Sequence, residues 1–225
     1  MSRTNYIPIA FPFIVVFFFL LVILLLLVQI GIISFAFYKL GFTPVHAFIL
    51  LFLSLIGSSI NIPVKEIISE HPVVSGKVIR FYGIRYIIPA LKIEKKTIIA
   101  VNFGGAIIPL FISAYLLFKI NIINALIGIF VMSMVAHSLA RPVKGLGIAM
   151  PALIPPLIAA LIALIISTEN AALLAYVSGT FGVLIGADLL NLNKVLELDA
   201  PIVSIGGAGT FDGIFLTGII SALLA

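Results

Sequence analysis

The stretch that decides the fold, residues 11–38, reads FPFIVVFFFLLVILLLLVQIGIISFAFY and contains no charged side chain. A helix that crosses a bilayer needs ~20 mostly apolar residues, and this stretch is longer than that. It is also longer than the ~7–15-residue apolar region of a cleaved signal peptide, and no A-x-A cleavage site follows it. We therefore expect a retained transmembrane helix near the N-terminus.

The composition of the whole chain agrees with this stretch. Of 225 residues, 63% are hydrophobic and 9% are charged, whereas soluble domains are about half apolar and a quarter charged. This composition excludes a soluble enzyme. The absence of cysteine excludes disulfides and thiolate sites, and His46, His71 and His137 lie too far apart in sequence to suggest a metal site. We expect no metal and no cofactor.

Seven stretches have the length and hydropathy of a membrane span, which predicts an all-α polytopic bundle that forms a single domain over 1–225. The predicted spans are 11–38, 44–62, 97–118, 120–140, 147–167, 171–192 and 203–225. With these spans, eleven Lys and Arg residues lie on one side of the membrane and only Lys39 and Lys119 on the other. The positive-inside rule then places the N-terminus in the cytoplasm and the C-terminus outside, in the cell membrane. Orientation thus explains the net charge of +5 without a nucleic-acid partner.

The segment 63–96 is the one sizeable soluble part of the predicted topology. It is rich in β-branched and aromatic residues and is broken by Gly76, Gly83 and Pro89, a pattern that predicts a small β-hairpin or short strands. Its net charge is +4, which favours contact with anionic lipid headgroups. The alternative is a docking site for an acidic partner.

Two pairs of segments predict an internal duplication. Residues 55–60 (LIGSSI) resemble 184–189 (LIGADL), and 103–106 (FGGA) resemble 205–208 (IGGA). Both pairs run in the same direction through the predicted membrane. The layout would then be three helices, one linker helix and three helices, a parallel repeat of the kind found in some transporters.

Two aspartates are the main candidates for function. Of eight acidic residues, only Asp188 and Asp212 lie within predicted spans. Acidic side chains are expensive in hydrocarbon and usually face the protein interior or a water-filled cavity. At ~1.5 Å rise per residue, both fall at nearly one depth in the cytoplasmic half. We expect them to share a polar pocket that holds a proton or small cation.

Small residues around the aspartates indicate closely packed and broken helices. Ser178, Gly182 and Gly186 recur at every fourth residue, as do Gly209 and Gly213, and this spacing allows close helix packing. The run 206–209 (GGAG) is a poor helix former and predicts an unwound entry to the last span. Candidate binding residues are Asp188, Asp212, Gly206, Gly207, Gly209 and Asn191.

One geometric detail leaves two alternatives open. At ~100° per residue, Asp188 points about 160° away from Gly186 in an ideal helix. Either the sixth span bends near Gly186, or Asp188 faces another neighbour such as the fifth span.

Other residues have weaker interpretations. Asn102, Asn193, Arg141 and Lys144 are lesser candidates for function, and His137 is interpreted as an interfacial residue. Tyr176 and Tyr115 are predicted to anchor the chain at the membrane interface. Pro155 and Pro156 are predicted to bend the fifth span.

Two families share motifs with this sequence. Residues 204–215 (SIGGAGTFDGIF), together with 186–190 (GADLL) and the prolines from Arg141-Pro142 to Pro155-Pro156, resemble a prokaryotic multi-pass membrane family, the domain of unknown function 1614. This resemblance implies a multi-pass membrane protein and no particular activity. The chain also resembles intramembrane aspartyl proteases of the Gly-x-Gly-Asp type, which implies that Asp188 and Asp212 form a catalytic dyad and that 151–153 (PAL) shapes a substrate cleft. The chain departs from that pattern because Phe211 precedes Asp212 and because 151–153 lies before the aspartates.

Three functions follow from these observations. The first is transport linked to a proton or cation bound by the aspartate pair. The second is intramembrane proteolysis by the same pair. The third is a non-catalytic membrane scaffold whose 63–96 loop docks a partner.

Overall fold

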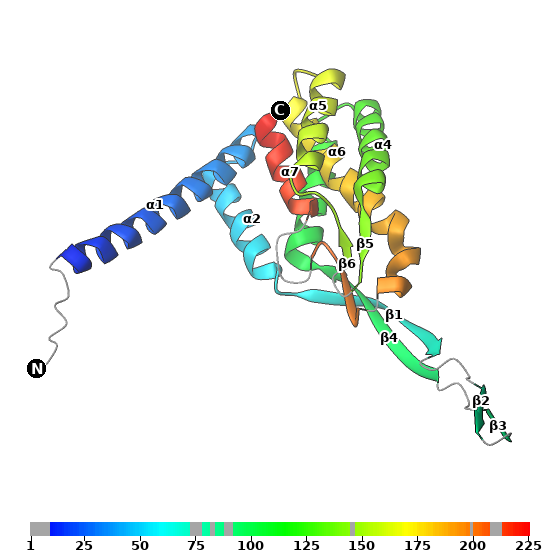
Figure 1. Ribbon diagram of the computed structural model, residues 1–225. Coiled ribbons are helices and arrows are strands. Elements are labelled where there is room, and N and C mark those ends of the chain that lie inside the picture. The colour runs from blue at the N-terminus through cyan, green and yellow to red at the C-terminus, as the bar shows by residue number, and fades with distance from the viewer. Residues whose placement is uncertain are drawn as a thin grey trace, which may run out of the picture.

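The computed structural model describes residues 10–72, 78–81, 84–87, 92–144, 147–198, 200–207 and 213–225. A helical bundle dominates these residues, as the sequence predicts (Figure 1). The α-helices are α1 (Ala10–Lys39), α2 (Pro44–Gly57), α3 (Ile108–Leu117), α4 (Ile122–Leu139), α5 (Ile154–Ile166), α6 (Ala171–Val183) and α7 (Gly213–Leu224). Two π-helices, η1 (Phe103–Ile107) and η2 (Leu184–Asp188), and one 3₁₀-helix, η3 (Leu189–Leu198), interrupt this pattern.

Three helical stretches among the described residues are long and apolar enough to cross a membrane. They are Val16–Lys39, Ile122–Leu139 and Ala171–Lys194. The other apolar helices have 10–17 residues, and a 13-residue α-helix is only ~20 Å long against a hydrocarbon core of ~30 Å. The count of seven spans and the orientation therefore stay predictions.

Several predicted spans have different boundaries in the structure. The span predicted from residue 97 is a strand up to Asn102, the one predicted from 203 also begins in a strand, and the fifth helix begins at Ile154 rather than at 147. Pro155 and Pro156 lie in its first turn, where a missing N–H removes no hydrogen bond. The prediction that they bend the helix is therefore wrong, because they begin it.

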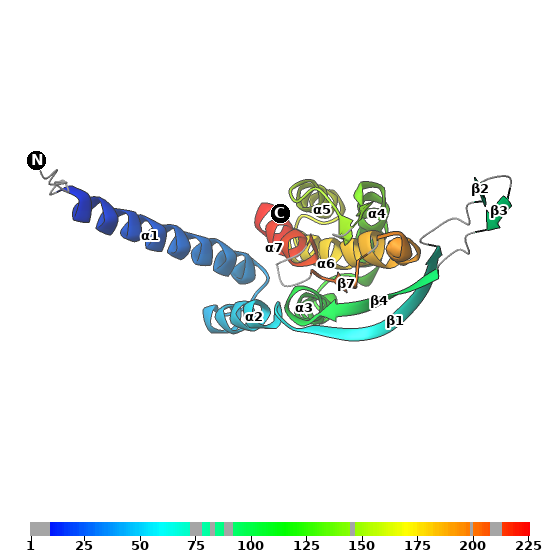
Figure 2. The same ribbon diagram turned by 60° about the horizontal axis from the view of Figure 1, so that its bottom comes forward.

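Helix α1 projects from the rest of the molecule, as Figures 1 and 2 show. Almost every side chain from Val16 to Phe35 is exposed, and the helix is apolar on all sides. From Val16 onward, where the side chains are described, only the C-terminal end of the helix packs into the core, through Ala36, Phe37 and the following Leu40. A helix that is apolar all round is suited to hydrocarbon rather than to water.

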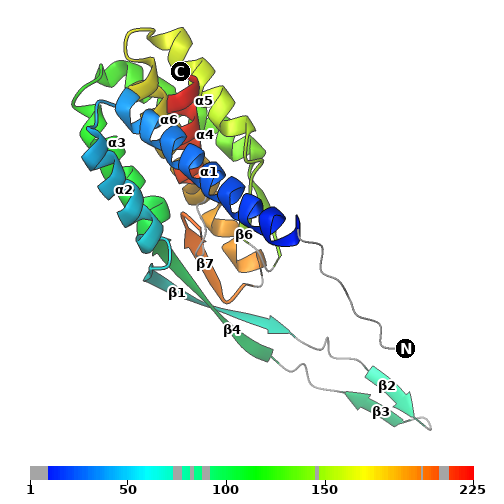
Figure 3. The same cartoon turned by 90° about the vertical axis from the view of Figure 1, so that its left-hand side faces the viewer.

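The two longest strands, β1 (Asn61–Pro72) and β4 (Lys92–Asn102), form a ribbon that leaves the bundle at the end opposite the C-terminus, as Figure 3 shows. They pair antiparallel from Asn61↔Asn102 to Pro72↔Lys92. β2 (Val78–Phe81) and β3 (Ile84–Ile87) form a hairpin, and β5 (Arg141–Val143) pairs with β6 (Gly147–Ala149). The strands β1 to β4 occupy much of the segment 63–96, for which the sequence predicts a β-hairpin or short strands.

The third strand of the main sheet brings distant parts of the chain together. β7 (Ile202–Ile205) pairs parallel with β4, with Ile98 opposite Ile202. The Thr97 hydroxyl donates to the Ala200 carbonyl oxygen over 3.0 Å. Each of these two strands is followed by a helix of the bundle, so the sheet joins the start of the third helix to the start of the last one.

Candidate functional site

The helical backbone changes its hydrogen-bonding pattern where the sequence places Asp188. α6 ends at Val183, the π-helix η2 runs to Asp188, and η3 begins at the next residue. Short π-helical segments within helices are rare and frequently lie at functional sites. The sequence left open whether the sixth span bends near Gly186 or Asp188 faces another neighbour. Because η2 contains Gly186, the regular α-helical geometry is lost at this residue, which agrees with the first alternative.

Asp188 lies at the end of η2 with a half-buried side chain. Its Oδ2 atom is shielded from the surface. Burying a carboxylate costs several kcal/mol unless polar groups compensate for the lost water. A carboxyl group kept at this position in so apolar a chain is therefore the first candidate for a proton or cation ligand.

The small residues of α6 and η2 pack against α4. A Cβ atom on Gly182 would be 2.5 Å from the Met132 side chain. One on Gly186 would overlap the carbonyl oxygen of Ser133, and the Ser178 side chain lies 3.0 Å from the Cβ position of Gly128. The stripe of Ser178, Gly182 and Gly186 thus permits close helix packing as predicted, and the helix that it contacts is α4. The contact between α6 and α7 uses Gly179 and Gly218 instead.

Asn191 ties this break to α4. Its side chain is completely buried, and its Nδ2 donates to the carbonyl oxygens of Gly186 at 3.1 Å and Ala187 at 2.9 Å. Lys194 Nζ donates to Asn191 Oδ1 over 2.8 Å. His137 Nδ1 is 3.2 Å from the Gly186 carbonyl oxygen and 3.3 Å from Asn191 Nδ2. Asn191, a predicted binding residue, therefore holds the backbone of η2 with its Nδ2.

A second polar centre lies where α2, β4 and β7 meet. Asn102 is fully buried, and its Nδ2 donates to the Ser58 carbonyl oxygen at 2.7 Å and to Asn61 Oδ1 at 3.0 Å. Its Oδ1 accepts from the Gly105 backbone N–H at 2.7 Å. The Ser204 hydroxyl donates to Asn61 Oδ1 at 2.6 Å. We call this set of contacts the Asn102 junction.

The Asn102 junction depends on glycines, which allow the backbones to touch. A Cβ atom on Gly105 would overlap the carbonyl oxygen of Gly206, and one on Gly104 would overlap that of Ser54. Gly206 and Gly207 have φ angles of 83° and 93°, in the left-handed region that favours glycine. These two predicted binding residues therefore form a non-helical turn after β7, beside η1.

From the sequence, Asn102 was only a lesser candidate, and Asn61 and Ser204 were not predicted as site residues. The signal for Asn61 was its place between the end of an apolar helix and Pro63, because asparagine is a common residue where a helix gives way to a turn or strand. Ser204 carried no comparable signal, since its contact depends on the pairing of β7 with β4.

Asp212 and Gly209 lie outside the described residues, so the separation of the two aspartates stays a prediction. Gly213, the next residue in the chain, has its Cβ position 3.7 Å from the Val183 side chain and 3.0 Å from that of Met150. The start of α7 thus lies against the end of α6, five residues before Asp188. Within the described part of the chain, no group of three or more His, Cys, Asp or Glu side chains could hold a metal ion.

Buried hydroxyl groups line the face of α6 that packs against α7. Tyr176 and Thr180, one turn apart, are both fully buried, and neither Tyr176 Oη nor Thr180 Oγ1 has a hydrogen-bond partner among the described residues. Both side chains lie within about 3 Å of the Cβ position of Gly218 on α7. The prediction that Tyr176 anchors the membrane interface is wrong, because the ring lies inside the bundle. Tyr115 is exposed, with Lys119 Nζ 4.6 Å from its ring centroid.

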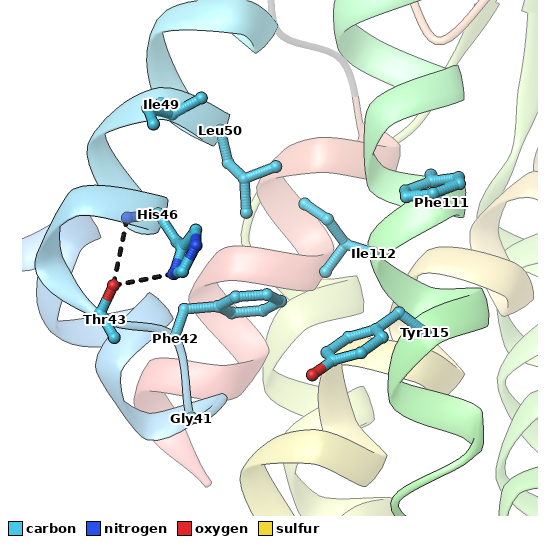
Figure 4. A pocket seen from close by; sticks show the side chains of 9 residues that line it. All are labelled: Gly41, Phe42, Thr43, His46, Ile49, Leu50, Phe111, Ile112 and Tyr115. Atoms are coloured by element: carbon cyan, nitrogen blue, oxygen red, sulfur yellow. Dashed lines mark hydrogen bonds between the residues drawn. The ribbon is translucent and has the colours of Figure 1, made fainter.

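A surface pocket of about 430 Å³ lies between α2 and α3, far along the chain from the aspartates (Figure 4). The rings of Phe42 and Tyr115 face each other there, with centroids 5.8 Å apart. His46 Nδ1 lies 2.8 Å from the hydroxyl oxygen of Thr43, the residue that caps α2. The lining is otherwise apolar, and the sequence indicated no site at these residues.

Comparison with known proteins gives one family. Residues 55–224 match the family described as Protein of unknown function (DUF1614). No curated protein and no solved structure matches the chain. The comparisons therefore give no support to the resemblance to intramembrane aspartyl proteases. Since the match covers most of the sequence, including α3 to α7, the chain belongs to the DUF1614 family.

Proposed function

We propose that this chain is a multi-pass protein of the cell membrane that moves a proton or a small cation through its bundle, with Asp188 as the central ligand. The N-terminus would lie in the cytoplasm, because eleven of thirteen basic residues fall on that side of the predicted topology. The exposed apolar helix α1 and the three span-length helices support the membrane location.

The observation that carries the proposal is the position of Asp188 at the end of a π-helix inside an apolar bundle. Intramembrane carboxylates usually line ion or proton pathways. In transporters, interrupted helices supply backbone groups to such sites. The π-helix η2 and the turn at Gly206 and Gly207 are two such interruptions.

A route for the ion would continue along α6. Tyr176 and Thr180 have buried hydroxyl oxygens on the face that packs against α7. Such oxygens can accept from a hydronium ion or water, or bind a small cation. Asp212 would belong to the same site, since Gly213 lies against Val183 at the end of α6.

The arrangement of β4 and β7 is also consistent with two related halves. Each strand leads into a helix, the strands are parallel, and Gly105 of one unit contacts Gly206 of the other. Movement of one half against the other at this contact would open the aspartate site to either side of the membrane. The duplication itself is part of the proposal.

Flux measurements on the purified chain in liposomes test the proposal. With a potassium diffusion potential as driving force, a pH-sensitive dye inside the liposomes reports proton entry, and a sodium-sensitive dye reports the alternative cation. We expect flux with the wild-type chain and background rates with Asp188→Asn, which keeps the shape of the side chain but removes its charge.

The matched control is Glu169→Gln, which neutralises an exposed carboxylate in the turn between α5 and α6. This control should transport as the wild type does. Unchanged proton and sodium flux in both Asp188→Asn and Asp212→Asn would contradict the proposal.

A further inference from the structure

A groove of about 500 Å³ runs along the outer side of α4, where η2 and η3 pack against it. Leu126, Phe130, Met134 and His137 line it from α4, and Ile185 and Leu190 line it from the other side. The four α4 residues are three or four positions apart and so form one stripe along the helix. The groove is therefore a long apolar channel with a polar group at one end.

The length of the groove matches one leaflet of a bilayer. From Leu126 to His137 the chain advances eleven residues, or roughly 16 Å at the rise of an α-helix. The hydrocarbon core of a membrane is ~30 Å thick, so each leaflet contributes ~15 Å. An extended acyl chain that reaches the bilayer midplane would fill the groove.

The polar end of the groove is basic. His137 Nδ1 is directed at the carbonyl oxygen of Gly186, 3.2 Å away, while the side chain as a whole stays exposed. The two Nδ2 hydrogens of Asn191 are used by the carbonyl oxygens of Gly186 and Ala187. Nδ1 of His137 is therefore the donor to Gly186, and in the imidazolium form Nε2–H is the donor left for a ligand at the mouth of the groove.

Lys194 adds a permanent positive charge at this end. Its Nζ donates to Asn191 Oδ1, so His137 and Lys194 contact the same carboxamide. Arg141 and Lys144, both exposed, follow the end of α4. No acidic residue lines the groove in the described part of the chain, and Asp188 Oδ2 is shielded from the surface.

We propose that this groove binds one anionic phospholipid, with an acyl chain against Phe130 and Met134 and the phosphate at His137 and Lys194. Basic pockets between membrane helices on the cytoplasmic side are suited to such headgroups. The proposal rests on the membrane location of the chain and not on ion transport, so it can fail or succeed independently of the flux experiment.

The test measures lipid retained by the purified full-length chain. The protein is incubated in detergent with phosphatidylglycerol or with zwitterionic phosphatidylcholine, and bound lipid is counted by native mass spectrometry. We expect one tightly held phosphatidylglycerol and weaker retention of phosphatidylcholine. Equal retention of both lipids would overturn the proposal.

Variants locate the binding. Lys194→Gln removes a positive charge and His137→Gln removes the Nε2 donor, whereas the glutamine amide can still donate to Asn191 or to Gly186. At ~1 kcal/mol for each basic group near a lipid phosphate, each should weaken phosphatidylglycerol binding about fivefold. The control Lys119→Gln removes a basic residue that stacks on Tyr115, at a different site, and should bind as the wild type does.

A fourth variant, Met134→Trp, fills the groove without changing its charge and should also reduce retention. If His137→Gln or Lys194→Gln does not fold, Met134→Trp still decides the matter, because full lipid retention in Met134→Trp contradicts the proposal. Millimolar inorganic phosphate should not displace the lipid. Full displacement would show that the apolar groove contributes nothing, and would also overturn the proposal.

Discussion

Replacing Asn102 with alanine should destabilise the protein more than any other single polar truncation at the Asn102 junction. The change leaves the Ser58 carbonyl and the Gly105 N–H without their partners, whereas Asn61 Oδ1 keeps its bond from Ser204. Each buried backbone group left unpaired costs about 1–3 kcal/mol, so two of them should lower the free energy of unfolding by about 2–6 kcal/mol.

The assay is unfolding in mixed micelles of increasing denaturing detergent, followed by circular dichroism. The control is Asn121→Ala, which removes the exposed N-cap of α4 and two hydrogen bonds to backbone N–H groups, at a typical cost of about 1 kcal/mol. Asn102→Asp should cost at least as much as Asn102→Ala, because it buries a carboxylate and places its oxygen against the Ser58 carbonyl oxygen. If Asn102→Ala costs no more than Asn121→Ala, the junction does not depend on its buried hydrogen bonds.

Three further predictions follow from the contacts described. Gly105→Ala should destabilise the chain by about 1–3 kcal/mol, because its Cβ would overlap the carbonyl oxygen of Gly206. The control Gly31→Ala meets nothing within 4 Å and should stabilise α1 slightly. Detergent unfolding compares the two variants, and equal effects on the free energy of unfolding would contradict the contact. Lys39→Gln should lower the free energy of unfolding by about 0.3–1 kcal/mol, because the Lys39 ammonium donates to the Leu223 carbonyl oxygen at the negative, C-terminal end of the α7 dipole. Unchanged stability of this variant at low salt would contradict this role. A tryptophan in place of Phe18 should be quenched by brominated lipid, and resistance to quenching would show that protein covers α1.

The sequence predicted the existence of most helices but not their ends. Residues 97–101 (TIIAV) are apolar and β-branched, a run that fits a buried strand as well as a helix when periodicity is the only guide. The chain is a strand here because both β1 and β7 pair with it. That pairing could not be foreseen, since the strands come from segments about 35 and 105 residues apart in the chain.

The backbone geometry around the candidate residues was predicted better than the packing of the helices, whereas the binding roles of these residues stay predictions. The glycines around 206 indicated a broken helix, and a turn follows β7 at Gly206 and Gly207. The phase of Asp188 against Gly186 left two alternatives open, and the π-helix η2 agrees with a change of geometry in the sixth span. The sequence did not predict α4 as the neighbour of the stripe Ser178, Gly182 and Gly186, since spacing shows that a helix packs closely but not against which other helix. Tyr176 was misjudged because tyrosine suits both an interface and a core.

The parallel pairing of β4 with β7 has a consequence for how the chain is made. Ile98 cannot meet Ile202 until a ribosome has produced all the residues between them, including α4, α5 and α6. During that interval one edge of β4 is exposed, and contacts between such distant residues form slowly. Open strand edges invite pairing with the wrong chain. Nascent copies translated on the same messenger would therefore be most vulnerable to mispairing in the interval between the synthesis of β4 and the arrival of β7.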